Sequence, residues 1–116
     1  MKIKNSMGTI HINNDVFAQL SGYAATNCFG VKGMATRTVG DGLVHLLRPE
    51  SMSRGVKVMF SKEGLIIDLH IIIDHGVNIQ ALCASIKEGV IYTVQRLTSI
   101  KVKAVNVFVD SIRSTL

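Results

Sequence analysis

The ten residues from Leu65 to Asp74, LIIDLHIIID, decide the fold of this chain. Aliphatic side chains occupy every second position of this stretch, at Leu65, Ile67, Leu69, Ile71 and Ile73. The positions between them hold apolar and polar residues in turn, Ile66, Asp68, His70, Ile72 and Asp74. This two-residue period predicts a central β-strand with one dry and one partly wet face, because a helix would spread the same aliphatic residues around its circumference.

The composition indicates a single domain with an aliphatic core. The chain has 116 residues, of which 47% are hydrophobic but only 5% aromatic, and it contains no tryptophan. A chain of this length buries about two thirds of its unfolded surface and folds without disulfides or metals. We therefore predict one domain over residues 1–116, with fraying at residues 1–7 and 111–116.

The sequence predicts a cytoplasmic location. No segment reaches the roughly 20 apolar residues that a membrane-spanning helix needs, since Asp68, His70 and Asp74 interrupt the most apolar stretch. The first six residues lack the apolar segment of a secretory signal. Cys28 and Cys83 are too far apart in sequence for a metal-binding or redox pair, so we expect two reduced, buried thiols.

The hydrophobic periodicity predicts an α+β fold with the element order β-α-β-(short α)-β-β-α-β. Besides the central strand, alternation predicts strands over residues 8–12, 31–38, 55–60 and 101–110. Helical spacing predicts main helices over residues 16–28 and 79–97 and a short helix over residues 42–48. We expect a mixed β-sheet with the two main helices packed on one face and the short helix at an edge.

The net charge of +5 comes entirely from the first half of the chain. Residues 1–62 hold eight lysines and arginines against three acidic residues, whereas residues 63–116 hold five of each. The candidate contacts to an anion or a nucleic acid are Lys32, Arg37, Arg54 and Lys57. The glycines of Gly30–Gly33 flank Lys32 as in the loop with which KH domains clamp a nucleic-acid backbone. For the basic residues the alternative is a solvated charged face, and for the Gly30–Gly33 segment the alternative is a plain turn.

No motif in the chain specifies catalysis. Asp68, His70 and Asp74 share one face of the predicted central strand, with His75 just beyond, and such side chains can hold a divalent metal. Zinc sites usually draw ligands from several elements at a recognisable spacing, which is missing here. The chain also lacks a nucleophile turn and a phosphate-binding glycine loop. We therefore predict no catalytic residue, no metal and no cofactor, and not an enzyme.

Five segments follow the pattern of a known family. They are Gly8–Val16, Ala24–Met34, Gly55–Val58, Tyr92–Val94 and Val105–Val109. Through them the chain resembles the alkaline-shock, or envelope-stress-response, family of Gram-positive bacteria in its short single-domain form. The resemblance implies a small cytosolic α+β protein, tied to cell-envelope homeostasis and often encoded beside a kinase of the fatty-acid or dihydroxyacetone type. Larger relatives self-associate and are held at the membrane by an anchor protein, and the family has no agreed catalytic residues.

We therefore predict a non-enzymatic interaction or scaffold protein linked to envelope stress or lipid homeostasis. It would act through self-association or through a protein partner, such as the neighbouring kinase or a membrane anchor, and it would reach the membrane only through that partner. The candidate interaction face lies on the semi-apolar side of the sheet, at Ile66, His70, Ile72 and Phe108. The alternative is a nucleic-acid-binding module that uses the basic cluster and weakens with added salt.

Overall fold

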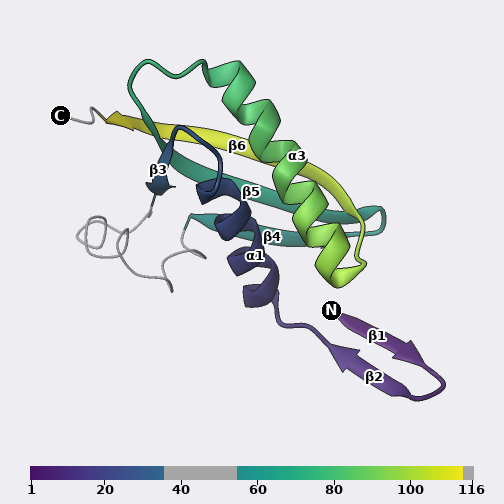
Figure 1. The fold of residues 1–116 in the computed structure, drawn as a ribbon. Helices are drawn as coiled ribbons and strands as arrows, with labels where there is room; N and C mark the ends of the chain where they lie inside the picture. The colour runs from purple at the N-terminus through teal and green to yellow at the C-terminus, as the bar shows by residue number, and fades with distance from the viewer. Residues whose placement is uncertain (36–54, 114–116) are drawn as a thin grey trace.

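The computed structural model describes residues 1–35 and 55–113 and has an α+β fold (Figure 1). Its elements are β1 (Lys2–Asn5), β2 (Gly8–His11), α1 (Asn14–Thr26), β3 (Val31–Met34), β4 (Val56–Ser61), β5 (Gly64–Asp74), α3 (Ile79–Thr98) and β6 (Val102–Arg113). The predicted fold class is confirmed. The predicted short helix over residues 42–48 lies outside the described residues, as do Arg37 and Arg54.

The predicted central strand is β5, which has neighbours on both sides. On one side β6 pairs with it in parallel from Leu65 to Asp74. On the other side β4 runs antiparallel to residues 64–69 and β3 runs antiparallel to residues 71–73. Because β3 and β4 lie end to end along the same edge of β5, the main sheet is three strands wide along most of its length.

Strands β3 and β4 meet at His70. The N–H of His70 donates to the carbonyl of Gly55 at 2.8 Å, and the carbonyl of His70 accepts from the N–H of Ala35 at 2.9 Å. Gly55 has a φ of +74°, and a Cβ atom built there would collide with the carbonyl oxygen of Ala35. Only glycine allows the two strand ends to approach this closely.

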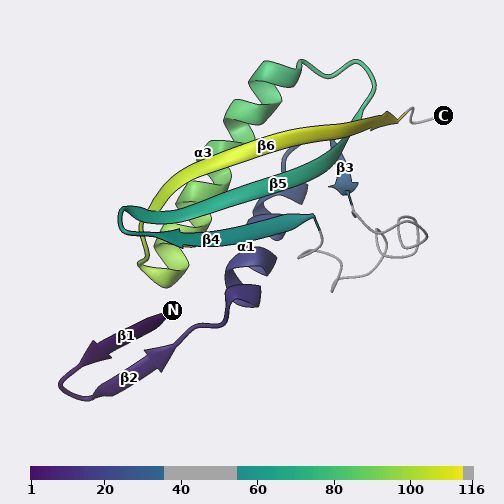
Figure 2. The same cartoon turned by 180° about the vertical axis from the view of Figure 1, so that it is seen from behind.

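Both helices cover one face of the main sheet and leave the other face bare (Figures 1 and 2). The five aliphatic side chains of β5 that were predicted to point inward are fully buried between the sheet and the helices. Helix α3 contributes Leu82, Ile86, Val90 and Val94 to this core, and α1 contributes Phe17, Ala24 and Ala25. Full burial of one such aliphatic side chain stabilises the fold by about 1.5–3 kcal/mol.

Side-chain caps fix where the helices begin. The Asn13 side chain accepts from the N–H of Asp15 at 3.0 Å, and the Asn78 side chain accepts from the N–H of Ala81 at 3.1 Å. Helical spacing from Phe17 and Leu20 would place Tyr23 on the buried stripe of α1, but Tyr23 is largely exposed. Small residues at Ala18, Ser21, Gly22 and Ala25 are buried instead. They let the helix lie close to the sheet, which a stripe of large side chains would prevent.

The N-terminal residues form a separate two-stranded hairpin, which corrects the prediction of a frayed start and a first strand in the main sheet. β1 and β2 pair from Lys2 with His11 to Asn5 with Gly8, and the Asn5 side chain accepts from the N–H of Met7 across the turn. The hairpin projects away from the main sheet (Figure 1). At the other end of the chain, β6 continues through Arg113, although fraying was predicted to start at residue 111.

Candidate functional site

The face of the main sheet that the helices leave bare is here called the open sheet face (Figure 2). Its members alternate with the buried core residues along three strands: Lys57 and Met59 of β4, Ile66, Asp68, His70 and Ile72 of β5, and Ala104, Asn106, Phe108 and Asp110 of β6. Cross-strand register places Met59, Ile66 and Ala104 in one row and Lys57, Asp68 and Asn106 in the next. The third row pairs His70 with Phe108.

The polar side chains of this face bind one another. The Asn106 amide donates to a carboxylate oxygen of Asp68 at 2.8 Å. His70 Nδ1 lies 3.0 Å from one carboxylate oxygen of Asp110 and 3.2 Å from the other. Because a carboxylate only accepts, this contact requires the proton on Nδ1. These contacts tie β5 to β6 across the open face.

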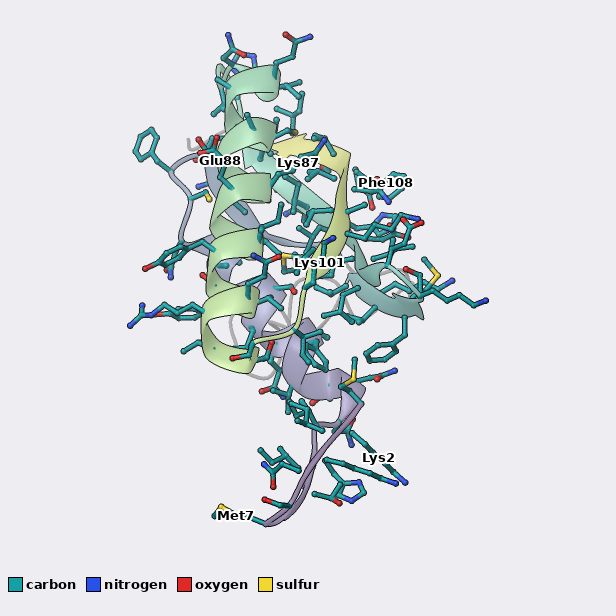
Figure 3. The ribbon with its side chains drawn as sticks, turned by 90° about the vertical axis from the view of Figure 1, so that its right-hand side faces the viewer. Lys2, Met7, Lys87, Glu88, Lys101 and Phe108 are labelled. Atoms are coloured by element: carbon teal, nitrogen blue, oxygen red, sulfur yellow. The ribbon has the colours of Figure 1, made fainter. Side chains whose placement is uncertain are left out.

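The Phe108 ring is held in place by His70. The two rings stack with centroids 4.6 Å apart and planes within 12° of each other. Phe108 nevertheless remains 44% exposed and projects from the side of the sheet opposite to α3 (Figure 3). An aromatic side chain that is both exposed and already oriented loses little conformational entropy when a partner covers it.

Three of the four residues predicted for the interaction face lie together. Ile66, His70 and Phe108 share the open sheet face, and His70 and Phe108 are in direct contact. Ile72 points to the same side but is only 6% exposed, so it adds little to a contact surface. The prediction missed Met59, which is 37% exposed beside Ile66. The alternation of β4, with Val58 inward, would have identified it.

The basic residues do not form one patch among the described side chains. Lys32 Nζ lies 3.3 Å from Asp74 Oδ1, and Lys57 lies opposite Asp68 in the sheet. Asp68 and Asp74 are separated by about 20 Å along β5, at 3.3 Å per residue. Each lysine is therefore beside a carboxylate of its own.

The glycine pair that resembles a KH clamp has a structural role here. Gly30 has a φ of +103° in the turn between the end of α1 and β3, while Gly33 belongs to β3. The loop joins a helix to a strand, as a plain turn does. A Cβ atom built at Gly30 would lie 3.1 Å from Val77 and 3.6 Å from Leu82, so the turn runs close to the start of α3.

The histidines and carboxylates considered for a metal do not converge. In the part of the chain that the structure describes, no three His, Cys, Asp or Glu side chains are placed to share a metal ion. Asp68 contacts Asn106, His70 contacts Asp110, and Asp74 contacts Lys32. Burial raises the pKa of the Cys28 thiol above its usual value, which disfavours the nucleophilic thiolate.

A surface hollow of about 620 Å³ lies between the turn after α1, the loop after β5 and the first turns of α3. Its lining includes Cys28, Val77, Ala81 and Leu82, with Asp74 and His75 among its polar members. Phe29, at 97% exposure, belongs to the same lining but does not fill the hollow. The Asp74 carboxylate is already beside Lys32, so the hollow offers no pair of free groups suited to acid–base catalysis.

The fold and the open sheet face together define a class: a small α+β domain whose two described helices pack on one face of the main sheet and leave the open sheet face uncovered. A family model described as having a cell envelope-related function matches residues 2–114, so the chain belongs to this family, the alkaline-shock protein 23 family. The resemblance seen in the sequence is thereby confirmed. No helix in the described ranges is both long enough and apolar enough to cross a membrane.

Three relatives are similar over most of their length. The protein YloU of Bacillus subtilis strain 168 is 36% identical, over 99% of this chain and 97% of YloU. The protein Spy1614 of Streptococcus pyogenes serotype M6 is 32% identical, over 97% of this chain and 94% of its own. The protein YqhY of Bacillus subtilis strain 168 is 27% identical, over 92% of this chain and 78% of YqhY. A comparison with solved structures finds no match.

Proposed function

We propose that this protein is a non-enzymatic interaction module of the cell envelope, and that it binds through the open sheet face. The observation that carries the proposal is the Phe108 ring, which is exposed, stacked on His70 and backed by the contact between His70 and Asp110. Met59 and Ile66 form a second apolar row on β4 and β5, separated from Phe108 by the row of Lys57, Asp68 and Asn106. An exposed, already oriented aromatic beside satisfied polar groups, with further apolar residues on the same face, is a usual composition of an interaction hot spot.

The occupant of this face is a second copy or a protein partner. Family membership supports a partner from the cell envelope, and the resemblance described above supports a kinase of the fatty-acid or dihydroxyacetone type or a membrane anchor protein. In this proposal the chain stays in the cytoplasm and reaches the membrane through that partner. It requires no cofactor, and its effect on lipid homeostasis is exerted by binding.

The test compares two exposed phenylalanines on different surfaces. Purified wild type, Phe108→Ser and Phe29→Ser would be measured by sedimentation velocity, and for binding to the purified kinase and anchor candidates. Loss of a hot-spot side chain costs about 2 kcal/mol, so Phe108→Ser should weaken binding about 30-fold. Phe29→Ser, which alters the turn after α1, should bind like wild type. Wild-type affinity in Phe108→Ser would overturn the proposal, and so would tight, salt-sensitive binding of an oligonucleotide in place of protein.

A further inference from the structure

Among the described residues, the N-terminal hairpin forms a two-stranded sheet that no third strand joins. None of its eight strand residues is buried, and Met7 at its tip is 93% exposed. Its register gives it two unlike faces: Ile3 pairs with Ile10 on one, while Lys2 pairs with His11 on the other. An isolated two-stranded hairpin is at best marginally stable in water, so its apolar face needs a surface to cover it.

The outer edge of β6 has no neighbouring strand among the described residues. β6 pairs only with β5, runs for 12 residues and contains no proline. Two register shifts, near Lys103 and Asp110, bracket an uncharged stretch from Ala104 to Val109. Long edges of this kind are usually shielded by charge or bulges, and here only the two ends are shielded.

Helix α3 extends beyond that edge. Its 20 residues span about 30 Å at 1.5 Å per residue, while the axes of the three strands of the sheet cover only about 10 Å. The helix crosses the sheet, and its N-terminal end lies beyond β6 (Figures 1 and 2). Ile79 therefore remains 44% exposed although it belongs to the same stripe as the buried Ile86 and Val90. A strand added to β6 would be covered by this part of α3.

We propose that the hairpin of one copy adds to the β6 edge of a second copy and lies beneath the overhanging end of α3. This inference rests on the proposed function, in that the chain works by binding protein surfaces. With the Ile3–Ile10 face turned toward Ile79, the Lys2–His11 face lies on the open side, where β6 carries Asp110. The hairpin thus matches both sides of the edge, apolar against apolar and basic against acidic.

In this proposal the hairpin and the β6 edge that it joins belong to different copies, because the hairpin cannot reach the β6 edge of its own chain. It projects from the end of the molecule below β4, with Lys2 and Met7 far below Phe108, while β6 forms the opposite edge of the sheet (Figures 1 and 3). The donor hairpin and the acceptor edge are different surfaces. Each copy can therefore donate its hairpin to one neighbour and accept the hairpin of another at its β6 edge. Such head-to-tail contacts close into rings or extend into chains.

The first test removes the apolar face of the hairpin in the full chain. Sedimentation equilibrium would compare wild type, Ile10→Asp and Tyr92→Asp, the last being a similarly exposed apolar residue on α3. Burial of an isoleucine is worth about 1.5–3 kcal/mol, so Ile10→Asp should weaken self-association at least tenfold. Tyr92→Asp should leave it unchanged. Equal association of Ile10→Asp and wild type would overturn the inference.

The second test keeps the hairpin intact, since Ile10→Asp also weakens the hairpin itself. In a Cys28→Ser, Cys83→Ser background, Thr9→Cys protein is mixed with Asn106→Cys protein under mild oxidation. Thr9 lies on the basic face of the hairpin and Asn106 on the open face of β6, so a mixed disulfide should form within minutes. Glu88→Cys on α3 replaces Asn106→Cys in the control. Equal yields with both partners would overturn the inference.

The two tests separate this inference from the proposed function. If Phe108→Ser loses binding while Ile10→Asp self-associates normally, the open sheet face is supported and the exchanged hairpin is wrong. If Ile10→Asp alone loses self-association and Phe108→Ser also binds the candidate partners like wild type, the hairpin is supported and the role of Phe108 is wrong. A strictly monomeric wild type overturns the hairpin inference, whereas the proposed function is then decided by the partner-binding measurement.

Discussion

Replacing Gly55 by alanine should destabilise the protein far more than an ordinary surface substitution. The residue has a φ of +74°, which costs an L-residue about 1–2 kcal/mol. Its new Cβ would also collide with the carbonyl oxygen of Ala35 and lie 2.9 Å from that of His70. Relief of the collision must separate β3 from β4 and strain the two backbone hydrogen bonds at His70, each worth about 0.5–1.5 kcal/mol. Gly55→Ala is therefore expected to lower the free energy of unfolding by about 2–5 kcal/mol.

The matched control is Gly76→Ala, which separates backbone strain from collision. Gly76 also has a positive φ, +90°, but a Cβ there meets nothing within 4 Å. Urea unfolding followed by circular dichroism would give both free energies of unfolding. Gly76→Ala should lose about 1–2 kcal/mol and Gly55→Ala clearly more. Equal losses in the free energy of unfolding would show that β3 and β4 do not meet at His70. The arrangement of the main sheet described above would then be wrong.

Three further predictions concern the core, a helix cap and a thiol. Ile67→Ala, at a fully buried position, should lower the free energy of unfolding by about 2–5 kcal/mol, whereas Ile66→Ala on the open sheet face should lose much less, as urea unfolding would measure. Asn78→Ala should cost about 1 kcal/mol and show faster amide exchange in the first turn of α3. Cys28 has a pKa raised by burial above 9.0, so folding favours its neutral thiol. That contribution is present below pH 9 and is lost as the pH rises through the folded pKa, and alkylation of Cys28 should be slower in the folded protein than in urea.

The sequence predicts those parts of the fold in which one strong pattern leaves a single arrangement. The alternation from Leu65 to Asp74 identifies β5 and its buried face, and helical spacing identifies the buried stripe of α3 from Leu82 to Val94. Periodicity does not state how wide the sheet is, however. Ile79 and Leu97 continue the same stripe but stay exposed because α3 is longer than the sheet is wide.

The features that the sequence did not predict, the β1–β2 hairpin and the His70–Asp110 contact, depend on contacts between segments. Pairing of β1 with β2 relies on a tight turn stabilised by the Asn5 side chain, and the sequence there lacks the asparagine–glycine pair that usually indicates such a hairpin. On the open sheet face, alternation places His70 and Phe108 on one side. The contact of His70 with Asp110 depends on a register shift in β6 that no sequence pattern indicates.

The open sheet face has the composition of a reversible interface. A permanent interface is usually more apolar, like a core cut in half, and exposes the separate subunits to aggregation. Here the Asp68–Asn106 and His70–Asp110 contacts keep these polar groups of the open sheet face satisfied while the face is uncovered. Phe108 remains exposed between these two contacts, and Met59 remains exposed in the row beyond Asp68 and Asn106. Such a face suits binding that follows the amount and location of a partner, as the interaction module proposed above requires.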